Sequence, residues 1–258
     1  MMQSFESKPG DAALGVDIGG SFLKLAPVDL HRGRLLADPI KIPTPDSAEP
    51  SDILPIIRDA VTVFGWTGPI GVGYPGVVKQ GVISTAAHVS EAWLNHDTRE
   101  SFGALTGERV NVINDADAAG LAEMRFGAGR DFNHSDGGTV LLFTFGTGIG
   151  SAVFIGGRLL PNTEFGHMYL DGVEAEDLAA ASIRVREGLS WEQWADRVNR
   201  YMAEMEKLFN PDLIIFGGGI TDNFDKYGHL LHTRAEIRRA EMQNDAGIVG
   251  AALAVTLP

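Results

Sequence analysis

The chain has 258 residues, of which 44% are hydrophobic and 21% are charged, the ordinary balance of a globular protein. Its 21 Lys and Arg residues stand against 34 Asp and Glu residues, and the formal charge of −13 argues against broad binding to nucleic acid or to an anionic membrane. The lack of cysteine excludes disulfides and thiolate metal sites, and the 32 glycines predict many tight turns.

We expect no targeting signal in the N-terminal segment. Residues 1–12 are polar and lack the charged-then-apolar layout of a signal peptide. The uncharged stretch 137–157 contains seven glycines, so it predicts two strands around a glycine turn and not a transmembrane helix. We therefore expect a cytoplasmic protein that binds neither membrane nor nucleic acid.

Two glycine-tipped hairpins organise the predicted fold. Residues 13–29 form two short apolar strands around the tip at 19–20, which is typical of a hairpin. About half a chain later, residues 140–155 repeat the pattern around the tip at 146–150. This quasi-repeat predicts a duplicated α/β unit with a ligand held between its two halves.

Apolar periodicity and breaker residues predict the remaining elements. In chain order they are a helix over 53–64, strands over 70–74 and 110–113, helices over 116–126 and 190–209, a strand over 213–216 and a helix over 246–255. We expect an N-terminal α/β domain over residues 1–115 and a C-terminal α/β domain over 116–258. The last helix is expected to pack back on the first domain.

Three glycine clusters follow predicted strands. They are Asp17-Ile18-Gly19-Gly20-Ser21 with nearby Lys24, Gly146-Thr147-Gly148, and Gly217-Gly218-Gly219. Backbone without side chains lets several N–H groups face one anion, and a neighbouring carboxylate can hold the Mg²⁺ that accompanies phosphate. Each cluster alone is equally typical of an ordinary turn, but three at strand ends favour a phosphorylated ligand.

Two polar motifs complete the set of candidate site residues. Asn114-Asp115 lies between a strand and a helix, where both residues are good helix caps, but where Asp115 could also accept a proton from a substrate hydroxyl. Glu164-Phe165-Gly166-His167 could clasp the vicinal hydroxyls of a sugar, or it could be a surface turn. A zinc role for His167 needs Asp or Glu partners that the sequence does not identify.

Together and in this order, the motifs resemble the ROK (repressor, open reading frame, kinase) sugar kinases, and within that family they are most similar to the polyphosphate glucokinases. The similarity extends through residues 114–130, 161–164 and 244–251 and spans nearly the whole chain. It implies an α/β fold of the duplicated actin-like ATPase (ribonuclease H-like) type, with an inter-domain cleft. It also implies phosphoryl transfer to the 6-hydroxyl of glucose.

The resemblance further implies a role for each motif. Asp115 is the expected general base, and the sugar hydroxyls are expected to bind Asn114, Asp115, Glu164, His167 and Glu176. The expected donor-binding residues are Asp17, Gly19, Gly20, Ser21, Lys24, Gly146, Thr147, Gly148, Gly217, Gly218 and Gly219. Asp17 would approach Mg²⁺ through water, the donor would be polyphosphate or ATP, zinc is not expected, and the chain would form a homodimer.

Some positions depart from the family pattern. Phe22 and Leu25 stand where relatives have small residues, which predicts a narrower or shifted donor pocket, and His88 replaces an asparagine near the sugar. These departures keep open an ATP-dependent glucokinase or glucomannokinase, and also a catalytically silent sugar-binding protein. We do not expect a repressor of the same family, because it needs a helix-turn-helix, for which residues 1–12 leave no room.

The phosphoryl donor is the least determined feature, because a charge of −13 repels a long polyphosphate unless local cations override it within a Debye length of about 8 Å. The candidate cations are Arg197, Arg200, Arg234, Arg238 and Arg239. We expect these arginines to belong to charged faces exposed to solvent, and we assign none of them to the polyphosphate path.

Overall fold

The computed structural model describes residues 11–87, 89–104 and 110–257, so His88 and most of the segment 1–12 lie outside the described residues. The chain divides into two compact units. The first contains the residues up to Ala122 together with those from Asp245 onward, and the second is Glu123–Asn244. Within the described ranges, no helix is both long and apolar enough to cross a membrane.

The first unit is built on a six-stranded sheet. Its strands are β1 (Ala12–Ile18), β2 (Phe22–Asp29), β3 (Arg34–Leu35), β4 (Ile40–Pro43), β5 (Ile70–Tyr74) and β8 (Val110–Asn114). The order is β3-β2-β1-β5-β8, with β4 also paired to β2. The hairpin β1-β2 is antiparallel, whereas β5 runs parallel to both β1 and β8.

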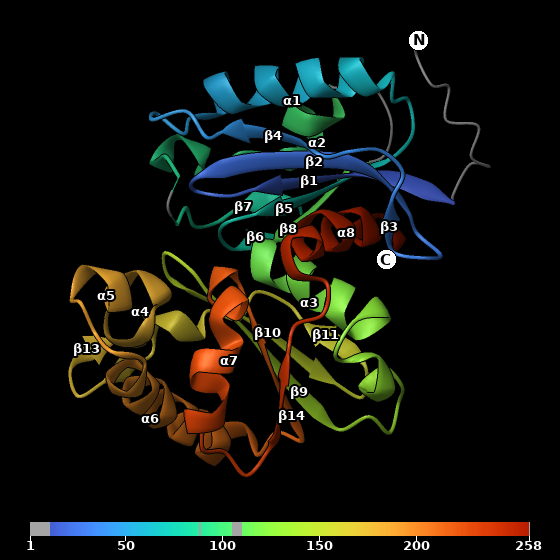
Figure 1. The fold of residues 1–258 in the computed structure, drawn as a ribbon. Helices are drawn as coiled ribbons and strands as arrows, with labels where there is room; N and C mark the ends of the chain where they lie inside the picture. The colour runs from blue at the N-terminus through green and yellow to red at the C-terminus, as the bar shows by residue number, and fades with distance from the viewer. Residues whose placement is uncertain (1–10, 88, 105–109, 258) are drawn as a thin grey trace. The chain divides into compact units, whose positions relative to one another are not determined.

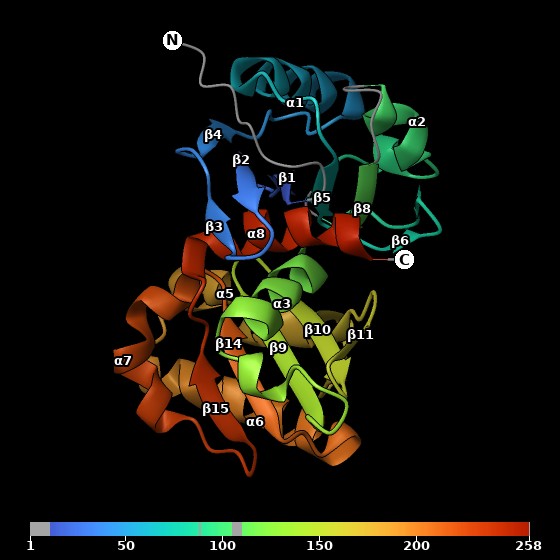
Figure 2. The same ribbon diagram turned by 90° about the vertical axis from the view of Figure 1, so that its right-hand side faces the viewer.

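Two helices, α1 (Pro50–Phe64) and α8 (Ala246–Leu253), cover opposite faces of this sheet (Figure 1). Helix α1 begins at a proline and ends at Gly65 in the left-handed conformation, as helix-terminus preferences predict. Helix α8 lies beside β1 and β5 (Figure 2). It approaches closely because Gly71 has no side chain, since a Cβ there would lie 1.7 Å from the carbonyl oxygen of Ala251.

The second unit is built on a five-stranded sheet. Its strands are β9 (Thr139–Phe145), β10 (Ile149–Ile155), β11 (Arg158–Leu160), β14 (Leu213–Gly217) and β15 (Glu236–Arg239). The order is β11-β10-β9-β14-β15, with an antiparallel hairpin β9-β10 and with β14 parallel to its two neighbours. Both sheets therefore use the same order and the same strand directions, which confirms the quasi-repeat predicted from the two glycine tips.

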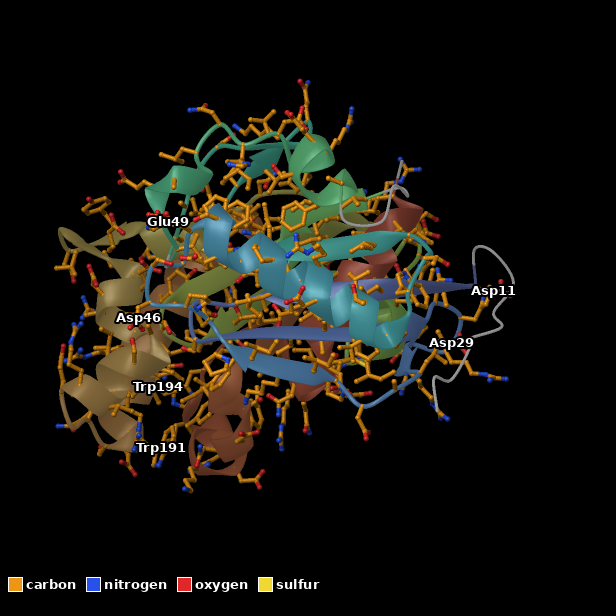
Figure 3. All side chains as sticks on the ribbon, turned by 90° about the horizontal axis from the view of Figure 1, so that it is seen from above. Asp11, Asp29, Asp46, Glu49, Trp191 and Trp194 are labelled. Carbon is orange, nitrogen blue, oxygen red and sulfur yellow. The ribbon has the colours of Figure 1, made fainter. Side chains whose placement is uncertain are left out.

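Helix α6 (Trp191–Phe209) supplies much of the core of the second unit. Ser190 and Gln193 form a capping box at its start, which satisfies two backbone N–H groups. Its buried face packs aromatic rings against the sheet, and the ring of Tyr201 lies 5.3 Å from that of Phe143. Trp191 and Trp194 lie at the beginning of α6 (Figure 3). Most of the apolar face of the helix predicted over 190–209 is thus core, although Leu208 is 64% exposed.

Shorter elements complete the two units. The short helices are α2 (Thr98–Gly103), α3 (Asp115–Phe126), α4 (Ala175–Ala179), α5 (Ala181–Arg186) and α7 (Phe224–Tyr227). Two small hairpins are formed by β6 (Val78–Lys79) with β7 (Val82–Ile83) and by β12 (Tyr169–Leu170) with β13 (Val173–Glu174).

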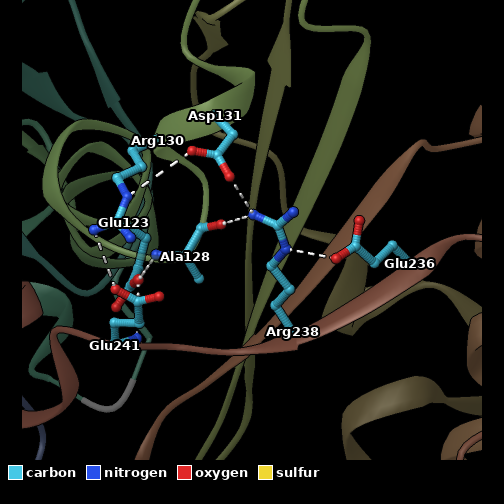
Figure 4. A network of polar contacts seen from close by, with 7 residues as sticks. All are labelled: Glu123, Ala128, Arg130, Asp131, Glu236, Arg238 and Glu241. Carbon is cyan, nitrogen blue, oxygen red and sulfur yellow. Dashed lines mark hydrogen bonds and ion pairs between the residues drawn. The ribbon is translucent and has the colours of Figure 1, made fainter.

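A buried carboxylate joins the two places where the chain enters and leaves the second unit (Figure 4). Glu123, which is fully buried, accepts hydrogen bonds from the N–H groups of Ala128, Glu241 and Met242 at 2.8, 3.1 and 2.7 Å. Burial raises the pKa of Glu123, although the three backbone hydrogen bonds act against that shift. Within the second unit, this residue holds the last turn of α3 against the segment that follows β15.

The long elements predicted from the sequence are all present in the structure. Small differences occur at their ends: α1 begins at Pro50 and α3 at Asp115, while the closing helix becomes 3₁₀ over residues 254–256. Helix ends fray and are the least certain part of any such prediction.

Candidate functional site

The first glycine tip places a carboxylate beside an ammonium group. The antiparallel register of β1 and β2 pairs Asp17 with Lys24, whose Nζ lies 3.3 Å from Oδ2 of Asp17. On its other side the carboxylate lies against the start of α8, where a Cβ on Gly247 would be 2.6 Å from Oδ2. The carboxylate oxygens are hard ligands of the kind that suits Mg²⁺.

The carbonyl groups of this first tip are held by Thr44. The Thr44 hydroxyl donates to the carbonyl of Gly19 at 2.6 Å, and its backbone N–H donates to the carbonyl of Ser21 at 3.0 Å. Among the described residues, none accepts a hydrogen bond from the N–H of Gly20 or Ser21, and both residues are exposed. The tip therefore presents backbone donors to solvent.

Phe22 and Leu25, which depart from the family pattern near this tip, differ in how far their side chains are exposed. Phe22 is 39% exposed, and the Lys41 ammonium lies 4.0 Å from the centre of its ring. Leu25 is fully buried in the core of the first unit. The expectation that Leu25 narrows a donor pocket is therefore wrong, because its position on the strand directs the side chain into the core.

Asn114 and Asp115 lie at the carboxyl end of β8 and the start of α3. The Asn114 side chain is a helix cap: its Oδ1 accepts from the N–H groups of Ala116 and Asp117 at 2.9 and 3.0 Å. Its amide also donates to the carbonyl of Gly76 at 3.3 Å. The partly buried Asp115 accepts a hydrogen bond from the N–H of Ala116 at 2.7 Å, so its carboxylate is oriented at the end of the strand.

The second glycine tip repeats the arrangement of the first with a different residue. The Ser182 hydroxyl donates to the carbonyl of Thr147 at 2.6 Å, and the Ser182 N–H donates to the carbonyl of Gly146 at 3.0 Å. No acceptor for the N–H groups of Thr147 and Gly148 is found within the described parts of the chain. Thr44 and Ser182 were not predicted from the sequence, because their partners lie 25 and 35 residues away.

The third cluster, Gly217 to Gly219, begins at the last residue of β14, which is parallel to β9. Gly218 needs to be glycine for the protein's own geometry, because its φ is +81° and a Cβ would lie 2.6 Å from the carbonyl oxygen of Phe145. A Cβ on Gly146 or Gly219 would instead meet no atom within 4 Å. The lack of a side chain at these two positions is thus not explained by packing.

Three candidate sugar residues lie together in the second unit. The Nδ1 of His167 is 3.9 Å from Oε1 of Glu176, whose Oε2 accepts from the N–H of Ile149 at 3.3 Å. Burial raises the pKa of Glu164; the charge of Glu176 raises it further, and His167 acts in the opposite direction. The charges of His167 and Glu176 therefore both act on the pKa of Glu164.

A fourth member of this cluster, Glu174, was missed in the sequence. Its Oε2 lies 2.8 Å from Nδ1 of His167, and this hydrogen bond is the main cause of the raised pKa of His167. Of the described residues, His167, Glu174 and Glu176 form the one group whose candidate metal-ligating atoms lie within 4.8 Å of one another. The carboxylate partners that the sequence did not identify for His167 are thus present.

Four of the five candidate arginines of the second unit are paired with carboxylates. Arg197 bonds Glu187 at 2.7 Å, Arg200 pairs with Asp171, Arg234 with Glu206, and Arg238 with Glu236. Arg239 differs: its buried Nε has no hydrogen-bond acceptor in the described ranges. It pairs in register with Phe216, directly before the third glycine cluster.

Comparison with known proteins gives consistent matches over most of the chain. The model of the ROK family matches residues 13–182. A polyphosphate glucokinase of Mycobacterium tuberculosis is 48% identical over 241 residues, which cover 93% of this chain and 89% of that protein.

Solved structures agree with these matches. An inorganic polyphosphate/ATP-glucomannokinase from Arthrobacter sp. strain KM has a TM-score of 0.89 at 42% identity, covering 96% of this chain and 99% of that one. A ROK family glucokinase from Streptomyces griseus, solved with glucose and AMPPNP, has a TM-score of 0.79 at 25% identity, covering 93% of this chain and 98% of that one. These similarities confirm the predicted fold class, the duplicated actin-like ATPase type.

Proposed function

The chain belongs to the ROK family, and from that premise we propose that it is a glucokinase that transfers a phosphoryl group from inorganic polyphosphate to the 6-hydroxyl of glucose. The observation that carries this proposal is the 48% identity to a polyphosphate glucokinase over 93% of the chain. ATP is the alternative donor, and mannose the alternative acceptor, because the similar Arthrobacter enzyme is named for both donors and as a glucomannokinase.

Asp115 is proposed as the general base. A carboxylate within hydrogen-bond reach of the attacking hydroxyl can accept its proton as the bond to phosphorus forms, which contributes roughly 10²- to 10⁴-fold to the rate. The hydrogen bond from the N–H of Ala116 orients the Asp115 carboxylate. The buried cap Asn114 fixes the start of α3, and its amide is proposed to contribute to sugar binding.

The sugar hydroxyls are proposed to bind Glu164, His167 and Glu176 as well as Asp115. Carboxylates accept hydrogen bonds from hydroxyl groups, and an imidazole can either donate or accept one. The coupling among Glu164, His167 and Glu176 supports this role, because such a group of partly buried carboxylates around an imidazole is typical of a binding site.

The two glycine tips are proposed to bind the phosphates of the donor. At each tip a hydroxyl residue, Thr44 or Ser182, holds the carbonyl groups, so that the remaining N–H groups are available to an anion. The open space at Gly146 and Gly219 supports the same role, because a side chain there would obstruct a close ligand and not the protein itself. Arg239 is the candidate cation for a longer phosphate chain.

Asp17 is proposed to approach Mg²⁺ through water. Its oxygens and the adjacent Lys24 ammonium suit a site where a divalent cation and a phosphate meet. When bound, Mg²⁺ would neutralise charge on the transferring phosphoryl group. A homodimer is proposed from the family resemblance, and a cytoplasmic location is proposed from the sequence.

The test is formation of glucose 6-phosphate by the purified protein with Mg²⁺. Polyphosphate is compared with ATP as donor, and glucose with mannose as acceptor. Preference for polyphosphate and glucose supports the proposal, whereas activity with ATP alone supports the alternative donor. Binding of glucose without product from either donor, in protein shown to be folded, would establish the silent sugar-binding alternative and contradict the proposal.

A further inference from the structure

His167 is the candidate sugar residue with the most specific neighbour. Its Nδ1 lies 2.8 Å from Oε2 of Glu174, a residue to which neither the sequence nor the comparisons assign a role. The side chain of His167 is 50% exposed and that of Glu174 is 31% exposed. The pair is thus partly open to solvent, so a ligand can reach it.

A local hairpin sets the position of Glu174. Strands β12 and β13 pair Tyr169 with Glu174, and the turn between them, Asp171 and Gly172, has φ values of +54° and +83°. Positive φ at both central positions is typical of the tight hairpin turn that Asp-Gly favours. The hairpin therefore presents Glu174 to His167 by backbone geometry.

The protonation of the pair follows from its chemistry. An ionised carboxylate can only accept, so the hydrogen bond requires the proton of His167 to be on Nδ1. The partner's pKa agrees: the hydrogen bond to His167 lowers the pKa of Glu174, which keeps it ionised. Within the described residues, no protein atom bonds Nε2, which leaves that nitrogen for a ligand.

We propose that Glu174 is a positioning residue for sugar binding: its carboxylate holds Nδ1–H of His167 so that Nε2 meets a hydroxyl of the sugar. The proposal rests on the proposed function and adds a residue to its binding site. A carboxylate that bonds one ring nitrogen fixes the orientation of the ring and the tautomer of the other nitrogen, as it does for metal-bound histidines.

The alternative is a surface ion pair without a role. His31 and Asp11 form such a pair in the first unit, with Nε2 3.0 Å from Oδ1 and side chains 69% and 46% exposed. In contrast, the His167 ring that Glu174 bonds also faces a second carboxylate, because its Nδ1 lies 3.9 Å from Oε1 of Glu176. Substitutions of Glu174, compared with a substitution of the control residue Glu187, distinguish a positioning role from a surface ion pair without a role.

Steady-state kinetics with substitutions at Glu174 provide the first test. Glu174→Ala is expected to raise the KM for glucose about five- to tenfold, the effect of one lost hydrogen bond, with kcat changed less than about twofold. Glu174→Gln retains an oxygen acceptor for Nδ1–H and is expected to restore most of the affinity. Equal loss in both variants, or an unchanged KM in Glu174→Ala, would overturn the proposal.

Glu187 offers a matched control. It is a partly exposed glutamate of the same unit that bonds a cation, Arg197, at 2.7 Å. Glu187→Ala is expected to leave the KM for glucose unchanged. A rise equal to that of Glu174→Ala would show that loss of any surface carboxylate weakens glucose binding, and would overturn the assignment to Glu174.

Nitrogen-15 NMR of histidine-labelled protein provides a test that does not depend on turnover. At alkaline pH, where the ring is neutral, the His167 signal, assigned with His167→Gln, should show the Nδ1–H tautomer and should lose it in Glu174→Ala. Added glucose should shift Nε2 of His167 and not the signals of His31. A ring with its proton on Nε2, no response to glucose, or a change on adding a chelator, which would reveal a metal on Nδ1, would each overturn the proposal.

The two proposals fail in different ways. Absence of glucose 6-phosphate with every donor would contradict the kinase function, while the tautomer and the glucose response of His167 would still report on Glu174. Normal kinase activity together with an unaltered KM in Glu174→Ala would leave the function intact and remove Glu174 from it.

Discussion

The hydroxyl of Ser182 donates a hydrogen bond to the carbonyl oxygen of Thr147 at 2.6 Å. The same geometry recurs in the first unit, where the Thr44 hydroxyl holds the carbonyl of Gly19. In each glycine tip, a hydroxyl residue donates hydrogen bonds to two loop carbonyls, one from its side chain and one from its backbone N–H. The duplicated fold thus repeats the same hydroxyl-to-carbonyl hydrogen bond at both glycine tips.

Removing either hydroxyl should weaken donor binding. Ser182→Ala and Thr44→Val leave a loop carbonyl without its donor, and each is expected to raise the KM for the phosphoryl donor about three- to tenfold. The KM for glucose should stay unchanged. Steady-state kinetics with each substrate varied in turn checks this, with Ser135→Ala, an exposed serine of the second unit, as the control. A rise in the glucose KM alone would contradict the role of the tips.

Arg239 is expected to contribute to the binding of long phosphoryl donors, whereas an arginine already paired with a carboxylate is not. Arg239→Ala is expected to raise the KM for polyphosphate more than that for ATP, because a longer anion meets more of the local charge. Arg200→Ala, which removes a guanidinium already paired with Asp171, is the control and should change neither constant. An equal rise in the KM for polyphosphate in both variants would show that donor binding depends only on the net charge of the protein.

The sequence predicted the long elements because each combines a periodic or continuous apolar run with a breaker, as in the strand that ends at Tyr74 before Pro75. It could not predict the hairpin of β12 and β13, whose strands have only two residues each. Because Glu174 lies on that hairpin, its contact with His167 was missed as well.

The polar motifs could be located in the sequence, but their roles could not be separated there. Asn114 and Asp115 both suit a helix cap, and only the structure shows Asn114 as the residue that accepts from Asp117. The family resemblance, and not residue spacing, supplied the role of Asp115. Contacts over long sequence separations, such as Thr44 with Gly19, depend on the folded sheet and have no local signal.

The close packing of α8 on the first sheet predicts unequal effects at two glycines of β5. In Gly71→Ala the new Cβ would lie 1.7 Å from the backbone oxygen of Ala251, whereas in Gly73→Ala the nearest atom is 3.5 Å away. Gly71→Ala is therefore expected to lower the free energy of unfolding by about 3 kcal/mol, and Gly73→Ala by less than about 1 kcal/mol. Denaturant unfolding of both variants measures this. Similar losses in the two would refute the packing argument.

Glu123 should be important for stability. Glu123→Ala leaves three backbone N–H groups without an acceptor, which is expected to cost about 3 kcal/mol of the free energy of unfolding. Glu241→Gln changes a carboxylate whose side chain is 52% exposed and serves as the control. A small effect of Glu123→Ala would indicate that water replaces the lost carboxylate.

The raised pKa of Glu123 also predicts how stability depends on pH. Between the ordinary glutamate pKa and the raised value, the folded state binds a proton that the unfolded state has lost. Through that window the contribution of Glu123 to the free energy of unfolding falls as the pH rises. The difference in stability between wild type and Glu123→Gln should therefore decrease with increasing pH above about 4.5. A difference that grows with pH would contradict the direction of the shift.

The most direct test of the account compares glucose phosphorylation by the wild-type protein and by Asp115→Asn, with glucose affinity measured in parallel by calorimetry. The amide keeps a hydrogen bond to the sugar but cannot accept the proton, so turnover is expected to fall at least about 10²-fold while the Kd for glucose changes less than about threefold. Asp59→Asn, at an exposed carboxylate of α1, should change neither. Near-normal turnover in Asp115→Asn would contradict the assignment of Asp115 as the base.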